Sequence, residues 1–298
     1  RLLNRLHLIW LLRLIPIFNV TLYASNAVDA GITIFQQNRN RVMKKEEVGH
    51  HFLARLGKTR LRPGGKQATD WLISKGQFSK EKKVLEVACN MCTTAIGLAK
   101  EYGCHITGVD LDHSVLEKAR RNIHEQGVAD RVEVMHGNAT RLPFDDASFD
   151  IVLNEAMLTM LPLEAKQNAV SEYLRVLKPN GVLLTHDVVL NVQDEKEGEL
   201  VMEQLRDAIH IKVTPLTQSA WQNLFLQAGF QTSEAIVGDM SLLSPQGLIR
   251  DEGLAGAWKI MRNAMKPENR ETFKKMFKTF NDPAKKLGFI AVCSQKAA

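Results

Sequence analysis

The chain has 298 residues, of which 45% are hydrophobic and 24% charged, a length and composition that allow a buried core and exclude a largely disordered protein. Its four cysteines lack the framework of a secreted disulfide scaffold, so we expect a reducing compartment and a cytoplasmic protein. The net charge of +6 arises in residues 1–66, which hold 12 of the 39 basic residues and three acidic ones; this excludes a basic nucleic-acid surface over the rest of the chain.

The first 42 residues contain an apolar run at 8–20 that Arg13 and Pro16 interrupt. The run is shorter than the about 20 apolar residues of a membrane span, and a central arginine is costly in a bilayer. Residues from Met43 onward resemble the start of a soluble protein. We therefore expect 1–42 to be an extension outside the fold, without stable membrane insertion. A surface helix and a membrane or export segment are the alternatives.

Strands and helices alternate after an N-terminal helical region at 43–78, which has a turn at 62–65. The second helix of the alternating region is predicted to begin with a capping box, Ser114 to Glu117. The alternation and the continuous apolar strands predict a parallel, doubly wound α/β sheet. Strands are expected at 83–88, 104–110, 131–136, 149–154 and 181–189, and helices at 93–102, 114–127 and 163–177.

The C-terminal half shows a less regular pattern. A strand is expected at 231–238 and a final strand at 287–293. Two helices are expected to open at Pro245 and Pro267, because proline is favoured at the first helical position. Two further helices are expected at 195–210 and 218–228.

The most informative stretch is VLEVACNMCTTAIGLA at 84–99, which predicts a buried strand, a tight loop and a helix. The following strand ends on Asp110. In a parallel sheet this layout places the loop, a helix N-terminus and Asp110 at one edge, where the acid can bind a ribose. Nucleotide-binding loops are usually glycine-rich, whereas this one offers Ala88, Cys89 and Asn90. Asparagine tolerates positive φ and alanine is small, so we expect a functional pocket.

These motifs, together with the run 142–150 and the turn 177–181, resemble the class I S-adenosylmethionine-dependent methyltransferases. The similarity is greatest to the type 11 group, which is akin to ubiquinone and menaquinone C-methyltransferases. The resemblance covers roughly 80–190 well and continues loosely to the end. It implies a mostly parallel seven-stranded Rossmann-like sheet whose last strand is antiparallel, with N-terminal helices and a helical insertion before that strand.

The resemblance also implies the domain organisation and the cofactor, S-adenosylmethionine. We expect a single methyltransferase domain at 43–298. Its parts would be a helical cap at 43–78, a cofactor-binding core at 79–190, and a C-terminal half at 191–298.

Individual cofactor contacts follow from matching positions of the family's motifs. Glu86 takes the place of the acid near the methionine portion, and Asp110 that of the ribose-binding acid. Asn138 lies in the turn that touches adenine, where an amide oxygen can still accept a hydrogen bond. The implied cofactor-binding residues are Glu86, Ala88, Cys89, Asn90, Asp110, Leu111, Asn138, Ala139 and Asn154.

Three further residues are candidates near the reaction centre. Arg62 can pair with the cofactor's carboxylate, since guanidinium binds carboxylates bidentately. Glu155, which ends the fourth strand, and His186, near the end of the fifth, are the candidate catalytic residues. Asp187 follows His186 directly, but adjacent strand residues point to opposite faces, so the two cannot form a simple dyad.

The predicted reaction is methyl transfer to a small-molecule acceptor by in-line displacement, with a base required only if the acceptor arrives protonated. Residues 244–282 are expected to cover the acceptor through Trp258, Met261 and Met265. The repeat at Phe273, Met276, Phe277 and Phe280 is expected to belong to the core.

Other functions remain as alternatives. The substituted loop glycines are the reason to consider a cofactor-binding protein with lost or altered catalysis as the main alternative. An RNA or protein methyltransferase is a further alternative, although the charge distribution makes nucleic acid an unfavoured partner. An NAD dehydrogenase is disfavoured because G-x-G-x-x-G is absent. Cys89 and Cys92 could form a redox pair or half a zinc site, but no second ligand pair lies at zinc spacing, so no metal is expected. The acceptor and the oligomeric state stay open.

Overall fold

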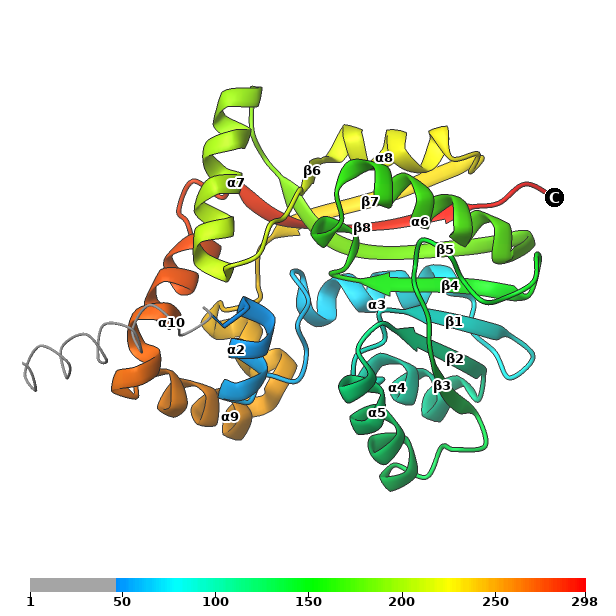
Figure 1. Ribbon diagram of the computed structural model, residues 1–298, viewed down its shortest axis with the longest axis horizontal. Coiled ribbons are helices and arrows are strands. Elements are labelled where there is room, and N and C mark those ends of the chain that lie inside the picture. Colours follow the sequence, from blue (N-terminus) through cyan, green and yellow to red (C-terminus); the bar gives the residue numbers. More distant parts are fainter. Residues whose placement is uncertain (1–46) are drawn as a thin grey trace, which may run out of the picture. The chain divides into compact units, whose positions relative to one another are not determined.

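A mixed β-sheet organises the part of the chain that the computed structural model describes, residues 47–298 (Figure 1). The expectations for residues 1–42 lie outside the described residues. The strands are ordered β3-β2-β1-β4-β5-β8-β7, and a short β6 pairs with β5. Because the order reverses beside β1, the carboxyl ends of β1 and its neighbours form the edge where open α/β sheets bind ligands.

The strand directions confirm the predicted parallel, doubly wound sheet and its antiparallel last strand. β8 (Leu287–Gln295) runs antiparallel to both β5 and β7. The two-residue β6 (Leu216–Thr217) adds an eighth strand to the seven that the family resemblance implied. The other strands are β1 (Lys83–Val87), β2 (His105–Asp110), β3 (Val132–His136), β4 (Phe149–Glu155), β5 (Leu177–Leu190) and β7 (Thr232–Asp239).

The expected turn at 177–181 is an irregular start of β5. The pairing with β4 shifts between Phe149 and Ile151, which face Leu177 and Val182. A side chain at Gly181 would approach the carbonyl oxygen of Lys178 to 2.8 Å, so this bend requires glycine.

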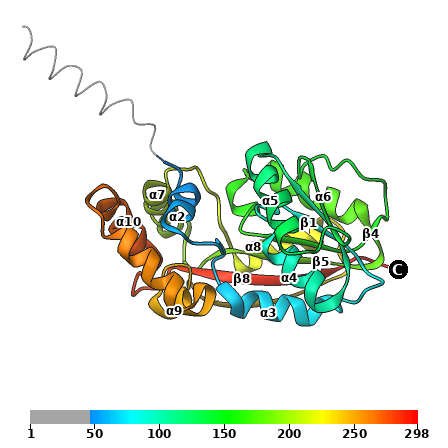
Figure 2. The ribbon, with the colours of Figure 1, turned by 90° about the horizontal axis from the view of Figure 1, so that it is seen from below.

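Two helical layers cover the sheet (Figures 1 and 2). One contains α3 (Gly65–Gly76), α4 (Thr93–Tyr102) and α5 (His113–Glu125), and the other contains α6 (Leu163–Val176) and α8 (Gln218–Gln227). Neighbouring residues of β1 serve opposite layers: Val84 packs with α3 to α5, and Leu85 packs with α6 and α8. This alternation explains why the central strands are apolar on both faces.

A third apolar cluster lies beside the carboxyl ends of the strands and is built from helices far apart in sequence. It joins α2 (Gly49–Leu56), α7 (Glu195–Ile209), α9 (Pro245–Ala264) and α10 (Pro267–Phe280). Gly253, with φ of 72°, interrupts α9. Among residues 47–298, no helix has the length and apolar character needed to cross a membrane. A short 3-10 turn, η1 (Leu158–Met160), follows β4.

The helix starts confirm one sequence prediction and correct another. Ser244 caps α9 by accepting a hydrogen bond from the Gly247 amide, and Pro245 is its first residue as expected. The capping box proposed at Ser114 is wrong, because α5 starts one residue earlier. Asp112 caps it by accepting a hydrogen bond from the Ser114 amide at 2.8 Å.

Candidate functional site

A cavity of about 400 Å³ opens at the carboxyl ends of β1, β2 and β4. Its polar end includes Glu86, Asp110 and Glu155. Its apolar end includes Leu205 and Phe280, from α7 and α10. The cavity therefore joins two chemically different halves in one continuous space.

The loop between β1 and α4 forms part of the polar end. Ala88, Asn90 and Cys92 have φ of 57°, 49° and 56°, which is the left-handed conformation that glycine adopts most easily. The Cys89 amide donates to the carbonyl of Val109 at 3.0 Å, and this bond ties the loop to β2. The substituted residues thus keep the backbone path that glycines would allow.

The two loop cysteines are packing residues in this structure. Both are free thiols and both are buried. Their sulfur atoms fill the space over Gly108, where a side chain would lie 2.9 Å from the Cys89 Sγ. A hydrogen bond with Cys92, together with burial, raises the pKa of the Cys89 thiol far above its ordinary value. The Cys89 thiol is therefore neutral and not activated as a nucleophile.

Asp110 ends β2 and lines the cavity beside this loop. Its carboxylate accepts hydrogen bonds from the amides of Asn90 and Asp112, each at 3.0 Å, through different oxygens. Each oxygen can still accept a further bond, so the carboxylate is oriented and available to a ligand hydroxyl. The neighbouring Leu111 is exposed and lies outside the cavity lining.

Glu86 supplies a buried polar atom that no other residue of 47–298 satisfies. The residue is only 6% exposed, lines the cavity, and its Oε2 has no hydrogen-bond partner within that range. Burial, followed by the nearby Glu155 charge, raises the pKa of Glu86 to about 8. An unpartnered buried carboxyl oxygen in a cavity wall fits a ligand that brings a hydrogen-bond donor or a positive charge.

Glu155, at the end of β4, connects four parts of the chain. Burial alone would raise its pKa, but the Arg62 guanidinium and the hydrogen bond from His186 outweigh burial and hold the pKa well below its usual range. An ionised carboxylate with so many donors is a poor proton acceptor. Its bonds come from the Arg62 guanidinium at 3.2 Å to both oxygens, the Thr69 and Thr94 hydroxyls at 2.8 Å, and His186 Nδ1 at 3.2 Å.

The predicted catalytic role of His186 requires correction. Its side chain is fully buried and does not line the cavity. Nε2 accepts a hydrogen bond from the Gly64 amide at 2.8 Å, so Nδ1 carries the proton and donates it to Glu155. Both ring nitrogens are used within the protein, which makes His186 a support for Glu155 and the 62–65 turn.

Arg62 lines the cavity, as its predicted role requires, but its described partners are protein groups. It donates to Glu155 and, at 2.6 Å, to the Thr69 hydroxyl. Its buried Nε has no partner among the described residues. That nitrogen remains available to an anionic ligand group.

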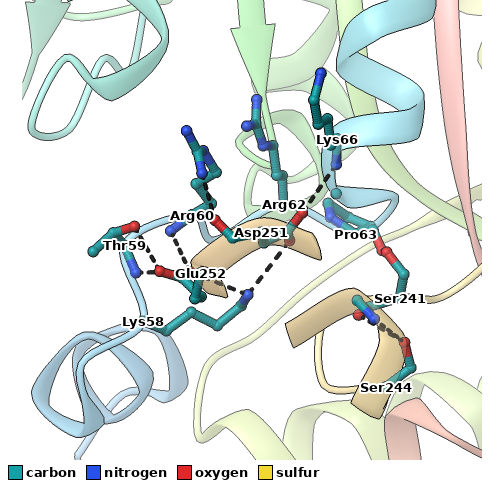
Figure 3. Close-up of polar contacts among 12 residues, drawn as sticks. Lys58, Thr59, Arg60, Arg62, Pro63, Lys66, Ser241, Ser244, Asp251 and Glu252 are labelled. Atoms are coloured by element: carbon teal, nitrogen blue, oxygen red, sulfur yellow. Dashed lines mark hydrogen bonds and ion pairs between the residues drawn. The ribbon is translucent and has the colours of Figure 1, made fainter. Parts of the chain in front are cut away.

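The segment that carries Arg62 is fixed by two acidic residues of α9, and no sequence motif had indicated them (Figure 3). Glu252 accepts hydrogen bonds from the amides of Thr59 and Arg60 at 3.0 and 3.1 Å. The buried Lys58 ammonium lies 3.5 Å from Glu252 and 3.6 Å from Asp251. Asp251 and Glu252 thus hold residues 58–62 against α9 and position the cavity wall.

Three other expected cofactor contacts lie outside the cavity lining. Asn154 is fully buried and donates to the Thr185 hydroxyl at 3.0 Å. Asn138 closes its own turn, since its side-chain oxygen accepts from the amide and hydroxyl of Thr140, both at 3.0 Å. Ala139 follows it in the same turn. These residues shape the strand ends in this structure.

The apolar end of the cavity differs from the expected acceptor cover. Trp258 and Met265 are 73% and 54% exposed, and neither they nor Met261 line the cavity. Met276 and Phe280, expected as core, pack in the third apolar cluster and also line it. Sequence reasoning missed most of the other apolar lining side chains, among them Leu53, Leu205, Ile209, Ile211, Val213, Met240 and Leu242.

Asp187 is a second residue whose position was not anticipated. It lines the cavity on the opposite side of β5 from His186 and is fully buried. Its oxygens accept hydrogen bonds from the amides of Thr159 at 3.1 Å and Val188 at 2.8 Å. Burial raises the pKa of this carboxyl group, so it binds a proton more readily than an ordinary aspartate.

Comparisons with known proteins agree with this geometry. Residues 84–181 match a family model described as a methyltransferase domain. The chain is 63% identical to an uncharacterized protein of Haemophilus influenzae over 254 residues, 85% of this chain and 100% of that protein. It is 32% identical over 167 residues to a demethylmenaquinone methyltransferase of Lactiplantibacillus plantarum, covering 50% of this chain and 70% of that enzyme.

The fold is also similar to a crystal structure of geranyl diphosphate C-methyltransferase from Streptomyces coelicolor, solved with Mg²⁺, geranyl diphosphate and S-adenosyl-L-homocysteine. The TM-score is 0.58 at 15% identity, over 78% of this chain and 77% of that one.

Proposed function

Because the chain belongs to the class I S-adenosylmethionine-dependent methyltransferases, we propose that it methylates an apolar small molecule held in the cavity. The proposal rests on one observation: a single cavity joins the polar strand ends to an apolar chamber. A cofactor at one end and an acceptor at the other would share one continuous space. Such a space holds the reacting groups in position, which is what methyl transfer requires of the protein.

The polar end fits the cofactor. Asp110 offers both carboxylate oxygens to the ribose, and the unpartnered Glu86 Oε2 accepts from the amino group. The unpartnered Arg62 Nε donates to the carboxylate, and the loop after β1 provides backbone that a ligand can approach closely. When bound, S-adenosylmethionine supplies a methyl group on a positively charged sulfur, open to in-line displacement by a nucleophile.

The apolar end fits the acceptor. Its lining consists mainly of aliphatic, methionine and phenylalanine side chains, which gain free energy by covering apolar ligand surface. The names of two similar proteins include demethylmenaquinone and geranyl diphosphate, and both molecules carry apolar chains. This agreement supports an apolar acceptor and leaves its identity to experiment.

Asp187 takes the role that the sequence had suggested for Glu155 and His186. It is the carboxyl group in the wall of the acceptor end, and its raised pKa suits proton uptake from a polar group of the acceptor. We expect Asp187→Asn to lower kcat about 100-fold and to remove the acidic limb of the pH–rate profile, with unchanged affinity for S-adenosylhomocysteine. The exposed Asp130→Asn is the matched control.

The substrate class can be tested with deuteriomethyl-labelled S-adenosylmethionine. The purified protein is incubated separately with an organic-solvent extract of bacterial cells, with total RNA and with total protein, and mass spectrometry locates the label. We expect label in a component of the organic extract. Label only in RNA or in protein would overturn the small-molecule proposal, and absence of label from all three with measurable cofactor binding would favour lost catalysis.

A further inference from the structure

Helix α9 carries an unusual share of the exposed apolar surface. Among residues 47–298, eleven large hydrophobic side chains are exposed, and five of them belong to α9 or its C-cap. Leu254 and Trp258 are 74% and 73% exposed. Leu254, Trp258, Met261 and Met265 recur at intervals of three and four residues, so they form one stripe on the helix surface. An apolar stripe of this kind marks an interaction surface.

The charges of α9 are divided between its two faces. Asp251 and Glu252 point inward and bind residues 58–62 (Figure 3). The exposed charged residues from 250 to 266 are all basic, and none of them forms an ion pair with another described residue. The first exposed acidic residues beyond them are in α10, at Glu268 and Glu271. The basic residues are Arg250, Lys259, Arg262 and Lys266.

We propose that this face, which we call the outer face of α9, docks reversibly on an anionic lipid surface. The outer face comprises Leu254, Trp258, Met261 and Met265 with the four basic residues named above. Tryptophan and other apolar side chains beside lysine and arginine are typical of helices that lie in a membrane interface. An anionic bilayer supplies both partners, since its acyl region takes the apolar stripe and its headgroups pair with the cations.

Charge favours this occupant over a second copy of the chain. A twofold dimer would press the same patch against itself, which brings four cations of one copy towards four of the other. Like charges at such close range oppose association. The outer face therefore complements an anionic surface better than it complements itself.

The position of α9 links docking to the cavity. α9 packs against α2 and α10, which contribute Leu53 and Phe280 to the apolar end (Figure 2). A bilayer against α9 would lie close to the helices that enclose the acceptor chamber, so an apolar acceptor could pass from lipid to protein without crossing bulk water. This last step rests on the proposed function, whereas docking itself needs neither cofactor nor acceptor.

Vesicle binding by the full chain tests the docking. The protein is sedimented with vesicles of phosphatidylcholine alone or mixed with phosphatidylglycerol, and tryptophan emission is recorded. We expect binding to the mixed vesicles, weakened by salt, with an emission shift to shorter wavelength that Trp258→Phe removes. The double variant Arg262→Gln/Lys266→Gln should bind about 25-fold more weakly, at about fivefold per cation.

Matched controls keep residues 1–46 and alter other surfaces. Arg121→Gln on α5 removes an exposed cation, as the α9 double variant does, and Leu226→Ser on α8 removes an exposed apolar side chain; both should bind as wild type does. S-adenosylhomocysteine binding, measured by calorimetry, should be equal in all variants and confirms that they fold. If that binding and methyl transfer persist while docking fails, only the docking proposal is lost.

Three results would overturn the docking. The first is that the α9 variants bind the mixed vesicles as strongly as the controls do. The second is that the wild-type chain binds vesicles of phosphatidylcholine alone as strongly as it binds the mixed vesicles. The third is a dimer in solution that Trp258→Ala dissociates, without vesicle binding, which would assign the outer face to a second copy.

Discussion

The two ends of the cavity are built by different interactions. At the polar end, directional hydrogen bonds fix each group: Asp110 is held by two backbone amides, and Glu155 by donors from four segments. At the apolar end, side chains such as Leu205 and Phe280 are held by packing alone. The polar end should therefore be sensitive to the loss of single atoms, and the apolar end to changes of volume.

The largest effect is expected for Glu155→Ala. Removing the carboxylate leaves the Arg62 guanidinium buried without its counter-ion, which costs about 3–5 kcal/mol of unfolding free energy. Urea denaturation measures this loss. The double variant Arg62→Met/Glu155→Met should recover part of it, because no uncompensated charge remains. A loss below about 1 kcal/mol in the single variant would show that Glu155 does not organise the polar end.

A smaller effect is expected for Asp110→Ala. Hydrogen bonds to a charged acceptor contribute about 1.5–3 kcal/mol, so the dissociation constant of S-adenosylhomocysteine should rise about 100-fold. Calorimetry measures the change, with the exposed Asp130→Ala as control. Unchanged affinity would contradict the assignment of Asp110 to the ribose.

The apolar end should respond separately and more weakly. Leu242→Ala removes part of the lining, and the lost apolar contact of about 1 kcal/mol should raise KM for the acceptor about fivefold. Cofactor affinity should stay at the wild-type value. The control is Leu226→Ala at an exposed position of α8, in which KM for the acceptor and cofactor affinity should both stay at their wild-type values. An equal loss of cofactor affinity in Leu242→Ala would mean that the two ends are not independent.

A separate effect concerns the pH dependence of stability. Between pH about 4.5 and about 8, the folded chain keeps a proton on Glu86 that the unfolded chain has released. Because the folded chain binds this proton and the unfolded chain does not, the free energy of unfolding falls as pH rises through this window. Thermal unfolding of Glu86→Gln should be less sensitive to pH over the same range, while Glu125→Gln should behave as wild type does. Parallel curves for wild type and Glu86→Gln would exclude the raised pKa.

The sequence indicated much of the polar end because its parts are close together in the chain. The strand, loop and helix at 83–102 were placed within a residue of their observed bounds, and Asp110 was placed at the end of its strand. Asn90 was expected to tolerate positive φ, and its φ is 49°. Such features depend on local periodicity and on backbone preferences, which a single chain segment expresses.

Candidate residues whose roles depend on distant partners were harder to assign. His186 looked like a pocket residue, yet the Gly64 amide, 122 positions away, occupies its Nε2. Trp258 looked like part of an acceptor cover because it is apolar and lies on a helix. Only the packing of α9 showed that it faces outward.

By itself the sequence determined the alternating α/β fold, the positions of the strands and helices in its first half, and the methyltransferase family. All of these follow from patterns between residues near one another in the chain. The tertiary structure alone decided that Glu155 is bonded to four segments, that Asp187 lines the cavity, and that Met276 and Phe280 line its apolar end. Burial and hydrogen bonding depend on distances between remote segments, and a residue that lines an apolar cavity has the same side chain as one that fills the core.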